Sequence, residues 1–393
     1  MLPAIFLTVV VDLIGFGLIL PLLPFYAGSF GASPFVIALL AAVFSIAQFL
    51  AAPLLGALSD RFGRKPVFLL CTALTAGGYL TLAFAQTLTV IFIARTIAGI
   101  GAGKIGIAQA IIADATPPEK RARGMGLVGA AFGIGMILGP VLGGLLVGPD
   151  PLHPNYHLPA FAAAGASLTA LLLAVLTIRE TLTVPLAARA GLRIRHPLAA
   201  LPQVSRAALA FILINGVINF VFAQVETLFP LFTAARLGWH AYEVGIAFTF
   251  IGVVVLTMQG VLIGPLTRRF GESRLLAAGI LALALGTVMT EWVFAEPVMG
   301  LSILLTAGGF GMINPSIASL ISRSAGEGHV GLTMGVSQSM SALGRVVGPV
   351  WGGLLFEQAG ITSPYLVGGA ILLLTLIAGW RHIRLPQPAG AAP

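Results

Sequence analysis

Five ionisable side chains lie inside long apolar stretches of this chain: Asp12, Arg95, Lys104, Glu226 and Arg345. A charge at the centre of a membrane helix costs about 2.5–3.5 kcal/mol on insertion scales, so each residue is a candidate functional residue. A carboxylate in such a place can exchange a proton, because desolvation favours the neutral acid and a nearby cation favours the ion. The chemistry that these residues predict is therefore reversible protonation.

Asp12 and Lys104 lie at matching depths in their predicted helices. At 1.5 Å per residue, Asp12 is roughly 12 Å from one end of the predicted helix 4–27. Lys104 is roughly 13 Å from the corresponding end of the predicted helix 88–113. The matching depths allow the two side chains to pair if the two helices are neighbours, and we expect both residues to take part in proton coupling. A fixed structural ion pair is the alternative.

A polar stripe marks a later apolar segment, where Asn215, Asn219 and Glu226 are spaced by four and seven residues and share one helical face. In a membrane helix this stripe should face a cavity or a partner helix. We expect these residues and Arg345 to bind substrate. Glu226 would bind a cationic group or a second proton, or would lie solvated near the outer mouth. Arg345 would pair with Glu226 or attract an anionic group.

The composition requires a membrane environment. Of 393 residues, 58% are hydrophobic and 9% are charged, whereas soluble domains carry about 25% charged residues. The apolar runs are long and unalternating, which favours helices over a β-barrel. We predict an all-α polytopic membrane protein with twelve transmembrane helices, at residues 4–27, 34–57, 67–86, 88–113, 124–147, 158–178, 207–232, 242–267, 274–295, 297–322, 331–356 and 363–382.

The basic residues set the predicted orientation, because 17 of the 21 Lys and Arg residues fall in loops on one side. The positive-inside rule makes that side cytoplasmic. We expect a multi-pass protein of the cytoplasmic (inner) membrane with both termini in the cytoplasm. The basic residues form short clusters between apolar segments, so the net charge of +8 does not indicate nucleic-acid binding. No Cys or His spacing indicates a metal site.

An internal repeat divides the chain. Two ten-residue stretches match at an offset of 209 residues, which predicts a six-helix half at 1–178, a cytoplasmic linker at 179–206 and a second half at 207–393. Small residues allow membrane helices to pack closely. We expect this helix-packing role for Gly135, Gly139, Pro140, Gly143 and Gly144, and for Gly344, Gly348, Pro349, Gly352 and Gly353.

Each half also carries a charged trio at its cytoplasmic helix ends. The first trio is acid, base, acid and the second is base, acid, base, so the signs are inverted. We expect each to form an ion-pair network, the alternative being ordinary loop charges with weak pairing. The trios are Asp60, Arg64 and Asp114, and Arg268, Glu272 and Arg323.

Several motifs resemble the major facilitator superfamily, and within it the twelve-helix drug:proton antiporters of the tetracycline-efflux-like branch. They are the loop Gly56–Pro66, the stretch Arg95–Gly99, the Gly-Pro-x-x-Gly-Gly stretch Gly139–Gly144, and Val11–Pro24. The resemblance implies transport by alternating access. It further implies that the helices 4–27 and 88–113 line one cavity of the first half, where Asp12 and Lys104 would meet. It also implies that the first trio latches the two halves while the transporter faces outward. For Arg95 it implies a role in proton transfer, with helix packing through hydrogen bonds as the alternative.

These observations predict a secondary active transporter, not an enzyme, that exports amphipathic drug-like compounds in exchange for protons. Its partners would be a small-molecule substrate, protons and the lipid bilayer, with no cofactor, and it would work as a monomer. A proton-coupled transporter of a metabolite, lipid or sugar is one alternative. A non-transporting membrane receptor or scaffold is another. No phosphate-binding loop of an ATP-driven pump is present in the sequence.

Overall fold

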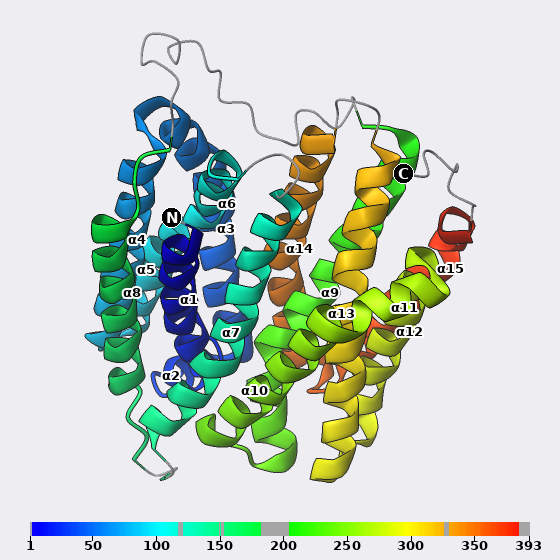
Figure 1. The fold of residues 1–393 in the computed structure, drawn as a ribbon. Helices are drawn as coiled ribbons and strands as arrows, with labels where there is room; N and C mark the ends of the chain where they lie inside the picture. Colours follow the sequence, from blue (N-terminus) through cyan, green and yellow to red (C-terminus); the bar gives the residue numbers. More distant parts are fainter. Residues whose placement is uncertain are drawn as a thin grey trace. The chain divides into compact units, whose positions relative to one another are not determined.

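The computed structural model describes residues 2–116, 121–148, 150, 153–181, 204–325 and 330–384. Within these ranges the chain forms helices joined by short turns, with no strand (Figure 1). Most of the predicted linker, residues 182–203, lies outside the described residues.

The helices follow the predicted order. In the first sequence half they are α1 (Leu2–Ile19), α2 (Leu23–Gly28), α3 (Pro34–Phe62), α4 (Arg64–Ala83), α5 (Leu88–Ala102), α6 (Lys104–Asp114), α7 (Arg121–Val147) and α8 (His157–Thr177). In the second half they are α9 (Arg206–Leu237), α10 (Ala241–Thr257), α11 (Ile263–Phe270), α12 (Glu272–Val288), α13 (Glu296–Ser324), α14 (Val330–Ala359) and α15 (Ser363–Arg384). A π-helical turn, η4 (Met258–Leu262), joins α10 to α11, and a 3₁₀ turn, η5 (Met289–Trp292), follows α12.

The described residues include eleven helical stretches that are long and apolar enough to cross a membrane. The remaining long helix, α14, has 30 residues but carries Ser337, Ser339, Ser341 and Arg345, which lower its hydropathy. The predicted all-α membrane fold with twelve long helices is confirmed for the described part of the chain. A helix of such polarity must keep its polar face away from lipid.

Two predicted spans are interrupted. The first is divided into α1 and α2 by a turn at Pro21, because proline has no N–H to continue the helical hydrogen bonds. The fourth is divided into α5 and α6 at Gly103. Lys104 therefore begins a new helix in the middle of an apolar span.

By its internal contacts the chain divides into two compact units. The first comprises Met1–His196, Glu226–Val253 and Pro349–Ile361, and the second comprises the rest. In the first unit α1 packs against α7 and α8, and α4 packs against α5 and α8 (Figure 1). In the second unit α12 packs against α13 and α15.

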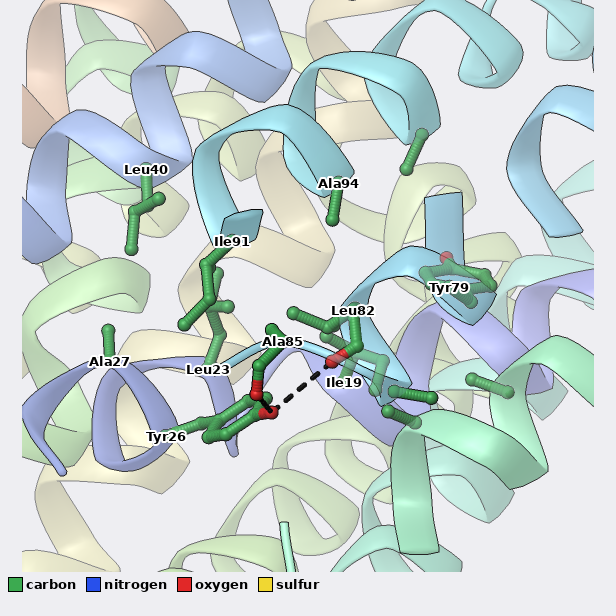
Figure 2. Packing of buried hydrophobic residues seen from close by; sticks show 14 of the residues in the cluster. Ile19, Leu23, Tyr26, Ala27, Leu40, Tyr79, Leu82, Ala85, Ile91 and Ala94 are labelled. Carbon is green, nitrogen blue, oxygen red and sulfur yellow. Dashed lines mark hydrogen bonds between the residues drawn. The ribbon is translucent and has the colours of Figure 1, made fainter. Parts of the chain in front are cut away.

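A buried cluster fills one end of the first unit. Figure 2 shows Tyr26 of α2 within it, beside Leu23 and Ala27. The Tyr26 hydroxyl lies 2.9 Å from the carbonyl oxygen of Ala85 and 3.2 Å from that of Leu82 (Figure 2). The hydroxyl thus meets the rule that buried polar groups are hydrogen-bonded, and it ties α2 to the end of α4.

The outer face of α8 fits a lipid environment. Leu168, Leu172 and Leu176 are 51%, 59% and 72% exposed. They recur every four residues, so they form one apolar stripe along the helix. A stripe of this kind facing water would be a large exposed patch, whereas facing lipid chains it carries no such cost.

The glycines of the repeated motif bring helix backbones into contact. A Cβ atom placed on Gly139 of α7 would lie 2.6 Å from the Cα and C atoms of Gly17 on α1. A Cβ on Gly135 would lie 2.6 Å from Leu13 Cβ, and one on Gly143 would lie 2.6 Å from the Leu18 carbonyl oxygen. Close approach of α7 to α1 therefore requires residues without side chains.

The second copy of the motif does the same on α14. A Cβ on Gly344 would lie 2.7 Å from the Gly216 carbonyl oxygen on α9, and one on Gly348 would meet the carbonyl oxygen of Phe220. The first helix of the first sequence half is α1, and the first helix of the second half is α9. Both copies of the motif therefore pack on the first helix of their own half. The repeat in sequence is thus a repeat in helix packing.

Candidate functional site

The structure brings Asp12 and Lys104 together. Lys104 Nζ lies 2.6 Å from Asp12 Oδ1 and donates to Thr75 Oγ1 at 2.8 Å. Ser167 Oγ donates to the same Asp12 oxygen at 3.1 Å. Asp12 and Lys104 are only 7% and 5% exposed. The pair is therefore a buried, hydrogen-bonded charge centre contributed by α1, α4, α6 and α8.

Close backbone packing places these side chains. A Cβ on Gly101 of α5 would lie 2.6 Å from the Cys71 carbonyl oxygen and 2.5 Å from Thr75 Oγ1 on α4. A Cβ on Gly15 of α1 would lie 3.1 Å from the Ala163 carbonyl oxygen on α8. Glycines thus bring α5, which ends two residues before Lys104, close to the helix of Thr75, and bring the helix of Asp12 close to that of Ser167.

The arrangement has two chemically distinct states. With Asp12 ionised, the two opposite charges compensate each other in a buried place. With Asp12 protonated, the charge–charge attraction to Lys104 is lost, and the buried cation keeps hydrogen bonds to neutral groups such as Thr75 Oγ1. Breaking one side of a buried pair costs about 3–5 kcal/mol, so a proton bound here changes the energy of the surrounding helices substantially.

Arg95 lies in the same unit and is 5% exposed. Its guanidinium carbon is 4.1 Å from the ring centroid of Phe44, a cation–π contact. Its Nε has no hydrogen-bond partner among the described residues. Tyr79 is buried on the same helix as Thr75, four residues further along α4.

The polar stripe of α9 meets a polar stripe on α14. The amide nitrogen of Asn215 donates to Ser337 Oγ at 3.0 Å and to Ser341 Oγ at 2.9 Å. Asn219 Nδ2 donates to Asn215 Oδ1 at 3.1 Å, and Arg345 Nη1 donates to Asn219 Oδ1 at 3.3 Å. The two asparagines are each 9% exposed. The network thus holds the Arg345 guanidinium through its hydrogen bond to Asn219.

Ser337 and Ser341 are absent from the sequence prediction although a signal existed. Together with Arg345 they recur every four residues, the spacing of one helical face. Glu226 is half-buried on α9, seven residues after Asn219. Asn215, Asn219 and Arg345, three of the predicted substrate-binding residues, are joined by hydrogen bonds.

The first charged trio is connected at the ends of α3, α4 and α6. Arg64 Nη1 lies 2.5 Å from Asp60 Oδ1, and Arg64 Nε lies 3.3 Å from Asp114 Oδ2. Arg64 Nη1 also donates to Ser59 Oγ at 2.8 Å. The arginine therefore lies between both acids.

Glu180, which the sequence analysis did not single out, supports this trio. Its carboxylate accepts hydrogen bonds from the backbone N–H groups of Arg64 at 2.9 Å and Lys65 at 3.1 Å, the first two residues of α4. Thr181 Oγ1 donates to Asp114 Oδ2 at 3.3 Å. The first N–H groups of a helix have no partner within the helix, and a carboxylate there is favoured by the helix dipole. The residues just after α8 thus complete the trio.

The second trio differs from its prediction. Arg323 Nη2 lies 3.3 Å from Glu272 Oε1, and Ser319 Oγ donates to the same oxygen at 2.7 Å. Among the described residues no ion pair includes Arg268. The Glu272 carboxylate instead contacts two side chains of α13. The predicted three-residue network is therefore a pair here, supported by Ser319.

Reversal of charge at Asp60 and Arg64 tests the first trio. We expect Asp60→Arg and Arg64→Asp each to reduce transport strongly, and the double reversal to restore it in part, because the second variant also places an acid beside Asp114. Initial rates of transport at equal protein levels check this. Equal loss in all three variants would show that the pairing has no role.

Comparison with known proteins agrees with this architecture. The family profile of the Major Facilitator Superfamily matches residues 5–263 and 259–393. The class C tetracycline resistance protein of Escherichia coli is 34% identical over 94% of both chains. Major facilitator superfamily domain-containing protein 10 of Bos taurus is 31% identical over 94% of this chain and 90% of its own.

A solved structure shares the fold as well. The human organic anion transporter MFSD10 (TETRAN) superposes with a TM-score of 0.73 and 28% identity over 96% of this chain and 98% of that chain. The profile match and the identity extend over nearly the whole sequence, including every helix that contributes to the charge centre. The chain therefore belongs to the major facilitator superfamily, in its tetracycline-resistance-like branch, and is a multi-pass membrane transporter.

Proposed function

We propose that this transporter exports an amphipathic organic compound in exchange for protons, by alternating access of the halves 1–178 and 207–393. The observation that carries the proposal is the buried pair of Asp12 and Lys104. A transporter that used no ion gradient would have little use for an ionisable pair at this depth, since buried charges in membrane helices are costly. The names of the bacterial relatives, tetracycline resistance proteins, support export of a drug-like compound.

In the proposed cycle Asp12 alternates between carboxylate and acid. The ionised form pairs with Lys104 and holds α1 to α6. Proton binding removes this attraction and leaves Lys104 to Thr75, which favours a different arrangement of these helices. Arg95, which is buried in the same compact unit, assists the proton's passage.

Substrate is bound, in this proposal, by the second half of the chain. Asn215 and Asn219 place Arg345 at the end of their network, and Glu226 lies on the same helix. The apolar surroundings accept the hydrophobic part of the compound, while the amides and charges orient its polar groups. In this proposal the proton and the substrate bind to different parts of the protein.

The trios at the other helix ends act as latches in the same cycle. Asp60, Arg64 and Asp114 hold α3, α4 and α6 together, and Glu272 and Arg323 hold α12 to α13. We place these loops on the cytoplasmic side of the inner membrane, with both termini in the cytoplasm, from the distribution of basic residues. The working form is a monomer.

A second candidate substrate class is organic anions. Arg345 is held by Asn219, and a guanidinium binds carboxylates with two parallel hydrogen bonds. One relative of known structure is described as an organic anion transporter. The bacterial relatives and the Glu226 carboxylate favour cationic or zwitterionic compounds instead, so the two classes differ in which of these residues they need.

Everted membrane vesicles with an acidified lumen provide the test. We expect a tetracycline-type compound to drive proton efflux, seen as recovery of a quenched pH dye, and no recovery in vesicles without the protein. Organic carboxylates added to the same vesicles test the second class. Substrate uptake that continues after the proton gradient is collapsed would contradict proton exchange.

A further inference from the structure

The start of α3, at the opposite end of that helix from Asp60, contacts the end of α14. Glu357, in the last turn of α14, reaches the first turn of α3. Its Oε2 accepts hydrogen bonds from Ser33 Oγ at 3.1 Å and from the backbone N–H of Phe35 at 3.3 Å. Ser33 is the N-cap of α3. The carboxylate of one sequence half therefore caps a helix of the other.

The backbones of the two helices meet one turn away. A Cβ atom on Gly353 would lie 2.6 Å from Ala38 Cβ and 3.2 Å from Phe35 Cα. Only a residue without a side chain fits there. Glu357, four residues further along, therefore extends a close contact between α14 and α3. The part of α14 from Pro349 onward lies in the same compact unit as α3.

The corresponding contact of the repeat, between α7 and α10, is built differently. A Cβ on Gly245 would lie 2.7 Å from the Pro140 carbonyl oxygen, so the backbones are equally close. At the start of α10, however, the carboxylate belongs to the same helix, because Glu243 accepts from the His240 N–H at 2.8 Å. Position 148, which matches Glu357 at the offset of 209, is a glycine. The contact of α14 with α3 thus includes a carboxylate from the other helix, whereas α10 is capped by its own Glu243.

We propose that Glu357 is a positioning residue of the transport cycle, an outer latch that stabilises the conformation in which α14 and α3 are joined at this end. Separation of these helix ends must break both hydrogen bonds and leave the N–H of Phe35 without its protein partner. A negative charge near a helix N-terminus contributes about 0.3–1 kcal/mol. The latch is therefore weak enough to open in every cycle. The proposal rests on transport by alternating access, which belongs to the proposed function.

Spin labels at Ser29 and Gln358, in a Cys71→Ser background, report whether the ends of α3 and α14 are joined or separated. We expect Glu357→Ala to raise the ratio of separated to joined molecules about two- to fivefold, the factor that corresponds to 0.3–1 kcal/mol. Glu357→Gln should give a smaller rise, because the amide keeps an acceptor without the charge. The matched control is Glu243→Ala, which also removes a helix-capping carboxylate but crosses to no other helix.

The distribution of distances between the two spin labels tests the latch without the need for a substrate or a proton gradient. An unchanged ratio in Glu357→Ala would overturn the latch, and so would an equal rise in Glu243→Ala. If vesicle experiments show no proton exchange while Glu357→Ala alone shifts the distances, the latch stands and the proposed coupling fails. Both glutamates are exposed or at a helix start, so the variants are expected to fold.

Discussion

Asp12→Asn is expected to abolish substrate-driven proton movement and to lower the stability of the protein. Asparagine cannot release a proton in the physiological range, so the exchange step is lost. It also removes the negative partner of Lys104, which is 5% exposed and lies 2.6 Å from the carboxylate. Leaving one member of a buried pair alone costs about 3–5 kcal/mol. Proton flux in vesicles and thermal unfolding of the purified variant measure the two effects separately.

The double variant Asp12→Asn, Lys104→Gln separates chemistry from folding. Removal of both charges eliminates the uncompensated cation, so most of the lost thermal stability should return. Proton coupling should not return, because no titratable group replaces Asp12. If the double variant regained coupling together with stability, the pair would be only structural and the proton would be exchanged elsewhere.

Gly139→Ala is expected to destabilise the protein by about 1–3 kcal/mol, the usual cost of overpacking. Its added Cβ would lie 2.6 Å from the Cα and C atoms of Gly17. Backbone atoms cannot rotate aside as a side chain can, so α7 and α1 must separate. Because α1 carries Asp12, this separation should also displace the carboxylate from Lys104 and reduce transport.

Gly129→Ala is the control on the same helix. A Cβ at Gly129 would meet nothing within 4 Å, and alanine in a helix is favoured over glycine by about 0.5–1 kcal/mol. The control should therefore be as stable as the wild type or more stable. Thermal unfolding in one detergent checks both variants. Equal stability of Gly139→Ala and Gly129→Ala would contradict the packing role of the motif.

Matching depths in the sequence, together with the family resemblance that places both helices at one cavity, predicted the association of Asp12 with Lys104. Charges are so rare in these apolar helices that depth from the helix end is a usable coordinate. The repeat likewise predicted which glycines pack closely, because a backbone contact tolerates no side chain. Both predictions were possible because a buried charge in a membrane helix and a close backbone contact each restrict strongly which residues are tolerated.

The hydroxyl partners of the pair could not be predicted. Thr75 and Ser167 look like any small polar residue of a membrane helix, because such residues commonly bond their own helix, as Thr75 Oγ1 does with the Cys71 carbonyl oxygen. Nothing in their spacing marks them as partners of Lys104 and Asp12.

Glu180 and Glu357 were missed for another reason. Each caps a helix far away in sequence, Glu180 at Arg64 and Glu357 at Phe35. Capping patterns can be read from sequence only when the cap is local, as with Glu243 and His240. Arg268 was assigned to a trio because it takes the place of Asp60 in the repeat. In the structure, the Glu272 carboxylate contacts Arg323 and Ser319 of α13.

Proton release from the purified transporter tests the central claim most directly. In weakly buffered detergent solution, a pH dye reports protons that leave the protein when substrate binds. We expect substrate-dependent proton release from the wild type when the experiment is repeated across a range of pH, and none at any pH from Asp12→Asn at substrate concentrations that saturate the variant. Equal release from both proteins would show that Asp12 does not carry the exchanged proton.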